Sequence, residues 1–407
     1  MKILQINAVY GYGSTGVIMQ DIQNCARQNG IDAFVAFPKG AGVPNEYSYT
    51  MGSFIDHKLH ALFSRIKGKQ AYFSKVATRG LLKYMDAIQP DIVHLHNLHS
   101  NYIHLNILLN YLAEKSIKTI VTMHDCWYFT GGCTHYTAIG CDKWKYGCGG
   151  CVQRKGYNAL LGDVTKEILR DRVKYLSAVP NITFVGCSEW IANEMKQSML
   201  KEVGFIAYIP NGFDLNIFYP REMSTNEAKK EALGLVGQQV ILAPAGKWLL
   251  PINKITFDYF TQHLPENTKL LLFGCNQQIE NVPNNVQLHG FIKSRDEMAD
   301  LYSIADVMVN CSREDTLSSL NLEAQACGTP VVTYDATGSK ETVDGTCGFA
   351  IPTGDYKALF RQTLDVCRLG KEAFWDGAVK WITENFEKTV NYNKYIQLYK
   401  DVYTQKL

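Results

Sequence analysis

The strongest constraint on the fold is a repeated alternation of short apolar strands with helical segments. Residues 2–9 (KILQINAV) have the pattern of a buried strand, and a glycine-rich turn at 11–16 leads into helical periodicity. A second strand follows, so this order predicts a βαβ unit of a parallel sheet. The pattern then recurs, with strands expected at 33–37, 91–97, 118–125 and 181–188 and helices at 17–30 and 103–116.

A second set of alternating elements follows an irregular connector. Residues 209–220 (IPNGFDLNIFYP) interrupt the periodicity with Pro, Asn and Gly. Beyond them, strands are expected at 239–246, 269–275, 286–290, 306–312 and 330–335, and a helix at 255–264. Two such sets predict an α/β protein with two Rossmann-like, doubly wound parallel-sheet domains. We expect an N-terminal domain at 1–208, a C-terminal domain at 209–383, and a final helix at 384–407 that crosses back to the first domain.

Composition narrows the function classes before any motif is considered. The 407-residue chain has a formal net charge of +2, whereas a dedicated DNA or RNA binder usually has a strong basic excess, so no nucleic-acid partner is expected. The apolar run at the N-terminus is too short for a signal peptide, and no window approaches about 18 uninterrupted apolar residues. We expect a cytoplasmic protein in which most of the twelve cysteines are thiols.

The most informative loop reads REDTLSS and follows the expected strand DVMVNCS. Ser318 or Ser319 can cap a helix there, so the loop that starts at Asp315 places backbone N–H groups at a helix N-terminus, where a phosphate can bind. Asp315 and Glu323 would repel that anion unless they accept hydrogen bonds from neutral hydroxyls, such as those of a sugar or ribose. Alternatively, both carboxylates only stabilise the helix dipole, at about 0.3–1 kcal/mol each.

The segment SREDTLSSLNLEAQACGTPVV contains Asp-x7-Glu and resembles the Glu-x7-Glu signature of the family 4 retaining glycosyltransferases with the GT-B fold. The first acid is Asp315, where the family has Glu. Further segments resemble the same family in the same order and together cover nearly the whole chain. They are GSTG, PDIVHLH, VTMHD, IPNGFDLNIFYP, HGFIKSRDEMADLYSIADVMVNCS and GSKETVDGTCGF.

The resemblance implies two domains that face each other across a cleft, with a UDP- or GDP-linked sugar donor held mainly by the C-terminal domain. Glu323 would bind the ribose hydroxyls, and Asp315 would bind a hydroxyl of the transferred sugar. Glu341 matches a glutamate that the family places near the donor, with helix capping as the alternative. The remaining donor contacts would come from loop amides at Thr316, Leu317 and Ser318.

The leaving nucleoside diphosphate requires positive charge, and no Asp-x-Asp motif at a strand end offers a metal site for that purpose. In the family a basic pair after the first strand of the C-terminal domain supplies this charge, and here GKWLLPINK contains Lys247 and Lys254. Fixed cations in a dehydrated site contribute several kcal/mol at the transition state. Catalysis is therefore expected to need no cofactor. A solvated surface position for either lysine is the alternative.

In the N-terminal half, the resemblance assigns a histidine and two glycines to the active site. His124 ends the expected strand 118–125, and its family equivalent approaches the donor sugar. Gly13 and Gly16 lie in GYGSTG, where the donor phosphates and the acceptor would approach the backbone. GYGSTG also matches the Gly-x-Gly-x-x-Gly pattern of dinucleotide-binding proteins, but no acidic residue ends the second expected strand.

Two other histidines, His94 and His96, alternate along the expected strand 91–97 and therefore point to one face of the sheet. We interpret them as structural polar residues near the cleft, with contact to the acceptor as the alternative.

Residues 57–85 contain five Lys, two Arg and no acid, with Leu, Phe and Ile interleaved at helical spacing. Such a basic amphipathic segment either covers the core as a solvated helix face or binds anionic lipid head groups, where each cation adds up to ~1 kcal/mol. The second interpretation suits a lipid-linked acceptor and a peripheral position on the inner face of a membrane.

A cysteine-rich segment at 126–151 follows His124 as an insertion. Four of its cysteines are spaced C-x7-C-x6-C-x2-C, and four thiolates would satisfy a tetrahedral zinc site. Disulfides and free thiols are the alternatives. The four candidate ligands are Cys133, Cys141, Cys148 and Cys151, and Cys126 and His135 are spare ligands.

Together these features predict a retaining glycosyltransferase that moves a sugar from a nucleoside-diphosphate sugar to a glycan or polyprenyl-linked acceptor in cell-surface polysaccharide biosynthesis. The retention of anomeric configuration is implied by the resemblance alone. A catalytically inactive, zinc-stapled scaffold that binds glycan or protein is the alternative. A GT-B epimerase or phosphorylase fits the motifs less well.

Overall fold

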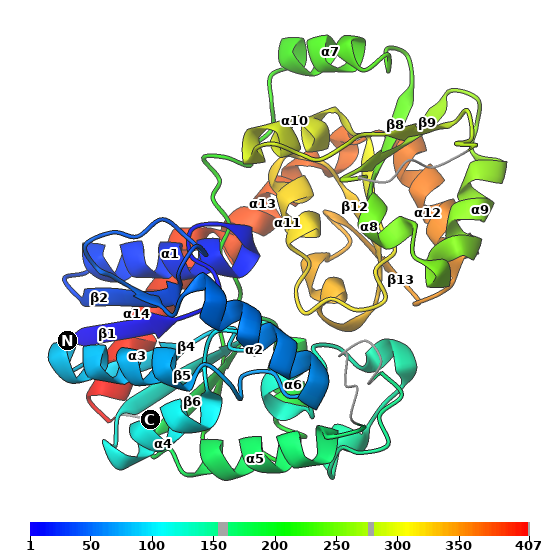
Figure 1. Ribbon diagram of the computed structural model, residues 1–407. Helices are drawn as coiled ribbons and strands as arrows, with labels where there is room; N and C mark the ends of the chain where they lie inside the picture. Colours follow the sequence, from blue (N-terminus) through cyan, green and yellow to red (C-terminus); the bar gives the residue numbers. More distant parts are fainter. Residues whose placement is uncertain (154–161, 276–280, 406–407) are drawn as a thin grey trace. The chain divides into compact units, whose positions relative to one another are not determined.

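The computed structural model describes residues 1–153, 162–275 and 281–405 and divides into two compact units (Figure 1). Unit 1 comprises Met1–Asn211 together with Thr389–Leu407, and unit 2 comprises Gly212–Lys388. Each unit contains one sheet whose strands all run parallel, with helices packed on it. The predicted fold class of two parallel-sheet α/β domains is confirmed.

The sheet of unit 1 has the strand order β3-β2-β1-β4-β5-β6-β7 in the described residues. Its strands are β1 (Lys2–Ile6), β2 (Asp32–Pro38), β3 (Ser48–Met51), β4 (Ile92–Leu95), β5 (Lys118–Met123), β6 (Ile182–Gly186) and β7 (Phe205–Tyr208). The chain extends the sheet from β1 first toward β2 and β3 and then, on the other side, toward β4 and β5. Because β1, β4 and β5 are parallel neighbours, their carboxyl ends lie next to one another. Ligands of open parallel sheets bind at such ends.

The helices of unit 1 cover both faces of this sheet. They are α1 (Gly13–Gln28), α2 (Phe54–Lys67), α3 (Lys75–Ile88), α4 (Leu105–Glu114), α5 (Thr165–Ser177), α6 (Glu189–Met195) and α14 (Lys388–Tyr403). On one face α1 and α14 share a core with the strands, in which Ile22, Tyr395 and Tyr399 are fully or almost fully buried. The last helix therefore belongs to the first unit, although the whole of unit 2 precedes it in the chain (Figure 1).

The sheet of unit 2 has the order β10-β9-β8-β11-β12-β13 in the part of the chain that the structure describes. Its strands are β8 (Gln239–Pro244), β9 (Thr268–Phe273), β10 (Val286–Leu288), β11 (Val307–Asn310), β12 (Val331–Tyr334) and β13 (Gly348–Ile351). Its helices are α7 (Met223–Ala232), α8 (Ala245–Trp248), α9 (Lys254–His263), α10 (Arg295–Ile304), α11 (Ser319–Ala326), α12 (Tyr356–Leu369) and α13 (Glu372–Phe386). Trp248 is buried in the core, and its indole N–H donates to the carbonyl of Val309 (3.0 Å).

The sequence pattern did not predict the edge strands β3, β7 and β13. Each of them is only four residues long and partly exposed, with Phe205 in β7 50% exposed, so none has the continuous burial of a central strand. The start of α1 also differs, because the helix begins at Gly13 inside the glycine-rich loop. The basic segment 57–85 lies in two helices, α2 and α3. None of the described helices is long and apolar enough to cross a membrane.

Candidate functional site

In unit 2, the loop after β11 is fixed by the side chain of Asn310. Its Nδ2 donates to Oγ of Ser318 (3.0 Å) and to Oδ1 of Asn321 (2.9 Å) in the first turn of α11. The amide of Asn321 in turn donates to the hydroxyl of Thr342 (2.9 Å). All four side chains are fully buried. Because buried hydrogen bonds hold both of its ends, the loop presents a defined set of backbone amides.

A second set of contacts ties Asp315 to the segment after β12. The backbone N–H of Asp315 donates to Oγ1 of Thr337 (2.9 Å), and the Asp315 carbonyl accepts from that hydroxyl and from the N–H of Gly338 (3.0 Å). Thr337 has a φ of +52°, an uncommon conformation for a β-branched residue. Next in the chain, Thr316 is buried, and its hydroxyl oxygen has no hydrogen-bond partner among the described residues.

Glu323 lies one turn into α11 and is half-buried. The hydroxyl of Tyr302, which is fully buried in α10, donates to its Oε2 (3.1 Å). Burial raises the pKa of Glu323 to about 7, against an ordinary value of 4.5. In the absence of a ligand the carboxyl group is therefore poised between its neutral and charged forms at physiological pH.

The two lysines of the predicted basic pair lie in different environments. Lys247 is half-buried in the short helix α8. Lys254 begins α9, is 73% exposed and forms an ion pair with Asp258 (2.5 Å). Glu341 is half-buried in the 3-10 helix η6 (Thr337–Thr342), the segment whose first residue binds the backbone of Asp315.

In unit 1, the predicted glycines position the first helix close to β1. A Cβ atom on Gly16 would lie 3.0 Å from Cγ2 of Val9 and 3.2 Å from the backbone nitrogen of Tyr10, so only glycine fits without a shift. Gly13 has a φ of +63° and opens α1. The carbonyl of Gly16 accepts from the N–H of Gly11 (3.0 Å).

A row of hydrogen-bonded side chains joins the ends of β1, β4 and β5. His96 follows β4 and is fully buried, with its Nδ1 3.0 Å from Nε2 of His124 and its Nε2 3.0 Å from Oε1 of Gln5. His124 follows β5 and is half-buried. His94, also fully buried, instead contacts Tyr399 (2.7 Å). The two histidines therefore belong to different hydrogen-bond networks: His94 contacts α14, and His96 contacts His124.

The orientation of the Gln5 side-chain amide determines the tautomers of His96 and His124. The side-chain amide of Gln5 donates to the carbonyl of Met19 (3.3 Å), so its oxygen faces His96 as the acceptor. His96 therefore carries its proton on Nε2 and accepts at Nδ1 from Nε2–H of His124. His124 is left with an unprotonated Nδ1. Burial lowers the pKa of His124 to about 4, so the ring is neutral and this nitrogen can accept a hydrogen bond.

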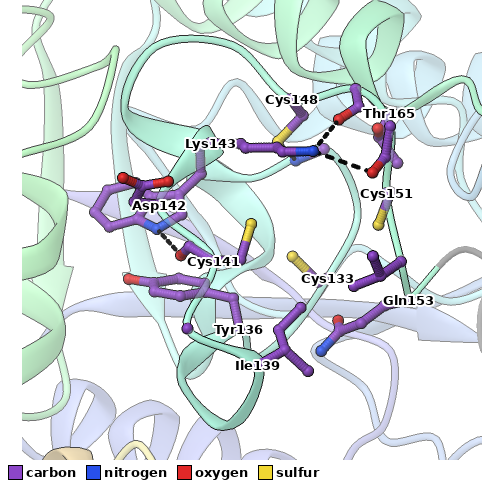
Figure 2. A pocket seen from close by; sticks show the side chains of 16 residues that line it. Cys133, Tyr136, Ile139, Cys141, Asp142, Lys143, Cys148, Cys151, Gln153 and Thr165 are labelled. Carbon is purple, nitrogen blue, oxygen red and sulfur yellow. Dashed lines mark hydrogen bonds between the residues drawn. The ribbon is translucent and has the colours of Figure 1, made fainter.

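The cysteine-rich segment after His124 contains the 3-10 turns η1 (Cys126–Phe129), η2 (Thr137–Ile139) and η3 (Lys143–Lys145). Cys133, Cys141, Cys148 and Cys151 are half-buried and line one pocket of about 210 Å3 (Figure 2). None of the twelve cysteines, all of which lie in the described residues, forms a disulfide. Among the described residues, no group of three or more His, Cys, Asp and Glu side chains is already arranged to hold a metal ion. The zinc site stays a prediction.

The helix α2 turns its polar side inward. Its two buried residues are His60 and Ser64, and Nδ1 of His60 lies 2.8 Å from the hydroxyl of Ser74. The exposed side carries apolar residues, each at least 44% exposed, and three exposed cations. The apolar residues are Phe54, Ile55, Leu59, Leu62 and Phe63, and the cations are Lys58, Arg65 and Lys67.

Sequence reasoning did not identify Gln5, Asn310, Tyr302 or Thr337 as part of either site. Gln5 and Asn310 do carry a detectable signal, because each is a polar residue inside an apolar strand sequence, KILQI and VMVN. Tyr302 lies in an amphipathic helix and gives no comparable signal.

Comparisons with known proteins agree with this arrangement. The family described as Glycosyltransferase Family 4 matches residues 15–217, and the family described as Glycosyl transferases group 1 matches residues 253–368. A D-inositol 3-phosphate glycosyltransferase of Xylanimonas cellulosilytica is 30% identical over 154 residues, which are 34% of this chain and 36% of that protein. The chain thus matches little more than a third of the length of that curated relative.

Two solved structures are similar over almost their whole length. Sucrose-phosphate synthase of Thermosynechococcus elongatus has a TM-score of 0.69 at 15% identity, over 99% of both chains. HepE of Anabaena, solved in complex with UDP, has a TM-score of 0.66 at 16% identity, over 98% of this chain and 100% of that chain. At these identities the likeness concerns the fold.

Proposed function

The chain belongs to the family 4 glycosyltransferases of the GT-B fold, and from that premise we propose that it transfers a sugar from a nucleoside-diphosphate sugar to a glycan or polyprenyl-linked acceptor. We further propose that transfer retains the anomeric configuration and serves cell-surface polysaccharide biosynthesis. A structural relative in complex with UDP supports a nucleotide-linked donor.

The observation that carries the proposal is that the half-buried Glu323 of α11 directly follows the loop after β11, which is fixed by hydrogen bonds. Glu323 already accepts one hydrogen bond, from Tyr302, and a ribose would add two hydroxyl donors. A carboxylate that accepts several hydrogen bonds is stabilised in its charged form. A ligand without those hydroxyls would leave it unsatisfied, which makes the site selective.

The loop supplies the remaining donor contacts. Asp315 would accept a hydroxyl of the transferred sugar, and the amides of Thr316, Leu317 and Ser318 would face the sugar and the phosphates. The hydroxyl of Thr316, which has no partner among the described residues, is a further donor for the ligand. Glu341 follows on the segment held against Asp315 and would lie near the same sugar.

Charge on the leaving nucleoside diphosphate would be stabilised by Lys247, and catalysis would require no metal ion. Lys254 is the weaker candidate for this role, because its exposed ammonium group forms an ion pair with Asp258 and would have to break that pair to reach a donor. The backbone at Gly13 and Gly16 would allow close approach of the donor phosphates. Preorganised donors and cations of this kind lower the transition-state barrier by several kcal/mol.

His124 would accept a hydroxyl of the donor sugar at its unprotonated Nδ1. The proton that Nε2 donates to His96 fixes that tautomer, and Gln5 fixes the tautomer of His96. Gln5 and His96 would thus act as positioning residues for His124. A neutral ring also avoids placing a cation that would compete with Lys247 for the phosphates.

The acceptor side would include contact with an anionic membrane through residues 57–85. On α2, five large apolar side chains lie in solvent beside Lys58, Arg65 and Lys67, which is unfavourable unless another phase covers them. Apolar side chains flanked by cations suit the head-group region of an anionic bilayer. The protein would then be cytoplasmic and peripheral on the inner face of the membrane.

The membrane contact is tested by vesicle flotation with and without anionic lipid. Each cation near such a surface contributes about 1 kcal/mol, so K58E combined with R65E should reduce binding strongly. The matched control is K196E combined with K201E, which reverses two exposed charges elsewhere in unit 1. Binding that ignores lipid charge, or equal losses in both double variants, would contradict the proposal.

Nucleotide binding is tested by thermal unfolding in the presence of UDP, GDP, ADP and their sugars. A ligand at a hundredfold its dissociation constant adds about 2.7 kcal/mol of stability, which shifts the melting temperature by several degrees. The shift should disappear in E323Q and persist in E314Q, which alters the carboxylate just before Asp315. The absence of a shift with every nucleotide would contradict the donor site.

A catalytically inactive scaffold with the same fold is the alternative function. It predicts that no nucleotide sugar is hydrolysed or transferred, even where one binds. Release of nucleoside diphosphate from the donor that gives the largest thermal shift, abolished by D315N, separates the enzyme from the scaffold.

A further inference from the structure

The segment between β5 and α5 has little regular structure to stabilise it. Within its described residues, the only helical turns are the 3-10 turns η1, η2 and η3. A small aromatic group, Phe129, Tyr136 and Trp144, packs between those turns and is buried. Neither a strand pairing nor an α-helix fixes the chain from 130 to 151. A segment of this kind commonly depends on a crosslink for a single conformation.

Four cysteines of this segment meet at one pocket. Cys133, Cys141 and the pair Cys148 and Cys151 come from three separate stretches of the segment, and all four line the same cavity of about 210 Å3. Figure 2 shows the sulfur atoms of Cys133 and Cys141 directed toward the same space, with Cys148 and Cys151 from the closing turn on its other side. The cavity is thus lined by four soft donor atoms.

The closing Cys-Gly-Gly-Cys turn has the Cys-x-x-Cys spacing of a metal-binding knuckle. Gly149 and Gly150 both have positive φ values, +134° and +58°, and the ammonium group of Lys143 binds their carbonyls (3.0 and 3.1 Å). The backbone N–H of Gly131 donates to Sγ of Cys148 (3.2 Å). An N–H donor stabilises a thiolate more than a thiol, and such bonds typically surround metal-bound cysteine.

A buried cation, Arg172, lies beside the pocket. Arg172 of α5 is 1% exposed, donates to the carbonyls of Trp127 and Thr130, and forms no ion pair within the described ranges. Burial lowers the pKa of Arg172 to about 10, while nearby groups that are negative when ionised, Tyr72, Cys133 and Asp125 among them, would raise it. Four thiolates around one dication leave a net negative charge, which would compensate this guanidinium.

We propose that Cys133, Cys141, Cys148 and Cys151 bind one Zn2+ ion through four thiolates. Four sulfur ligands suit zinc in a closed tetrahedral site, and such an ion fixes a loop without entering the chemistry. Each S–H group gives up its proton to solvent as its sulfur binds, so no oxidant or reductant is needed. The site is independent of the transfer reaction.

Binding would draw the thiols inward. Since no described group is already closed around a metal position, rotation of the half-buried cysteine side chains would complete the site. Because each sulfur gives up its proton as it binds the metal, affinity for zinc should rise with pH.

The direct test is metal analysis of the full chain, purified without metal-affinity resin and dialysed after incubation with Zn2+. About one zinc ion per chain is expected. C148S combined with C151S should lose it, and C25S combined with C275S, which removes two half-buried thiols outside the pocket, should keep it. Replacement of zinc by Co2+ in the unaltered protein should give the intense visible absorption of a tetrahedral thiolate site, whether or not the variant folds.

Any one of four results would overturn the proposal. The first is no bound zinc in the unaltered protein, and the second is equal zinc in both double variants. The third is a disulfide among these cysteines, detected by mass spectrometry after alkylation without reductant. Iron with a visible chromophore in place of zinc would also contradict the assignment, because zinc centres are colourless.

Discussion

The loop after β11 and the segment after β5 both begin where a parallel strand ends, yet they are stabilised in different ways. The first is short: Asn310 of β11 binds the side chains of Ser318 and Asn321, and Thr337, which follows β12, binds the backbone of Asp315. The second spans several 3-10 turns and is tied to the unit by the buried Arg172. The difference is one of length, because only a short loop keeps its whole backbone within reach of the strands on either side.

The comparison also separates function from stability. Where neighbouring side chains hold the backbone of a loop, the side chains of the loop can contact a ligand. Where a segment must hold itself together, its own side chains are used for that purpose. Substitutions in the first loop should therefore change activity, and substitutions around the second should change stability.

The largest effect is expected from D315N. We expect kcat/KM to fall at least about a hundredfold, roughly 2.7 kcal/mol, because the variant removes a charged acceptor for a substrate hydroxyl. The free energy of unfolding should change little, since the backbone of Asp315 keeps its contacts with Thr337. E314Q is the control. Activity of D315N within fivefold of the unaltered enzyme would contradict the expectation that substitutions in this loop change activity.

A loss of stability of about 3 kcal/mol is expected from R172M. Two carbonyl oxygens, those of Trp127 and Thr130, would lose their buried donor, at roughly 1–3 kcal/mol each. Denaturant unfolding of unit 1, followed by tryptophan fluorescence, measures this change. R170M, which alters a side chain that is 75% exposed, should cost almost nothing. Equal effects of the two variants would mean that Arg172 does not tie the segment.

A pH dependence of about tenfold per unit is expected for nucleotide binding below pH 7. The ligand hydroxyls need the charged form of Glu323, whose pKa burial raises to about 7, so affinity should fall as the pH drops below that value. The stability of the unbound protein should change with pH in the opposite direction. The stability that the neutral carboxyl contributes is fully present below its ordinary pKa of 4.5 and is lost as the pH rises through about 7.

Calorimetric titration of nucleotide between pH 5 and 8 measures that dependence, and E314Q, which should still bind nucleotide, should keep it. A flat profile in the unaltered protein would show that Glu323 is charged throughout, contrary to the effect of its burial.

The smallest effect, roughly tenfold in kcat, is expected from Q5L. The variant removes the acceptor of the His96 proton, so His124 no longer has a single tautomer. The KM for the donor should change little, because Glu323 and the loop after β11 would supply most of the donor contacts. Q5E keeps an acceptor oxygen and should restore most of kcat. A loss of stability without a change in kcat would show that the row of hydrogen bonds is only structural.

The sequence predicts the two parallel-sheet units and the position of the acidic motif because both depend on local pattern. Apolar runs alternate with helical periodicity, and Asp315 and Glu323 lie eight positions apart on one loop and helix. The partners of these residues could not be predicted in the same way. Thr337 is 22 residues from Asp315, and Gln5 is 91 residues from His96. Such contacts follow from strand order, which the linear pattern does not encode.

The sequence also does not show which partner a charged side chain on a helix contacts, or which face of the helix is exposed. Lys254 fits the basic pair by position, but an ion pair with Asp258 one turn later competes for it. The segment 57–85 is amphipathic by pattern, yet only its fold places His60 inward and the phenylalanines outward on α2.

The return of α14 to unit 1 has a consequence for synthesis of the protein in the cell. Tyr392, Tyr395 and Tyr399 fill the core between α14 and the first strands, and they leave the ribosome only after the whole of unit 2 has been made. Until then the nascent first unit exposes an apolar sheet face, which favours chaperone binding or aggregation. Unit 2 is continuous in the chain and can fold first. Removal of residues 389–405 should therefore damage the unit made first and spare the one made later.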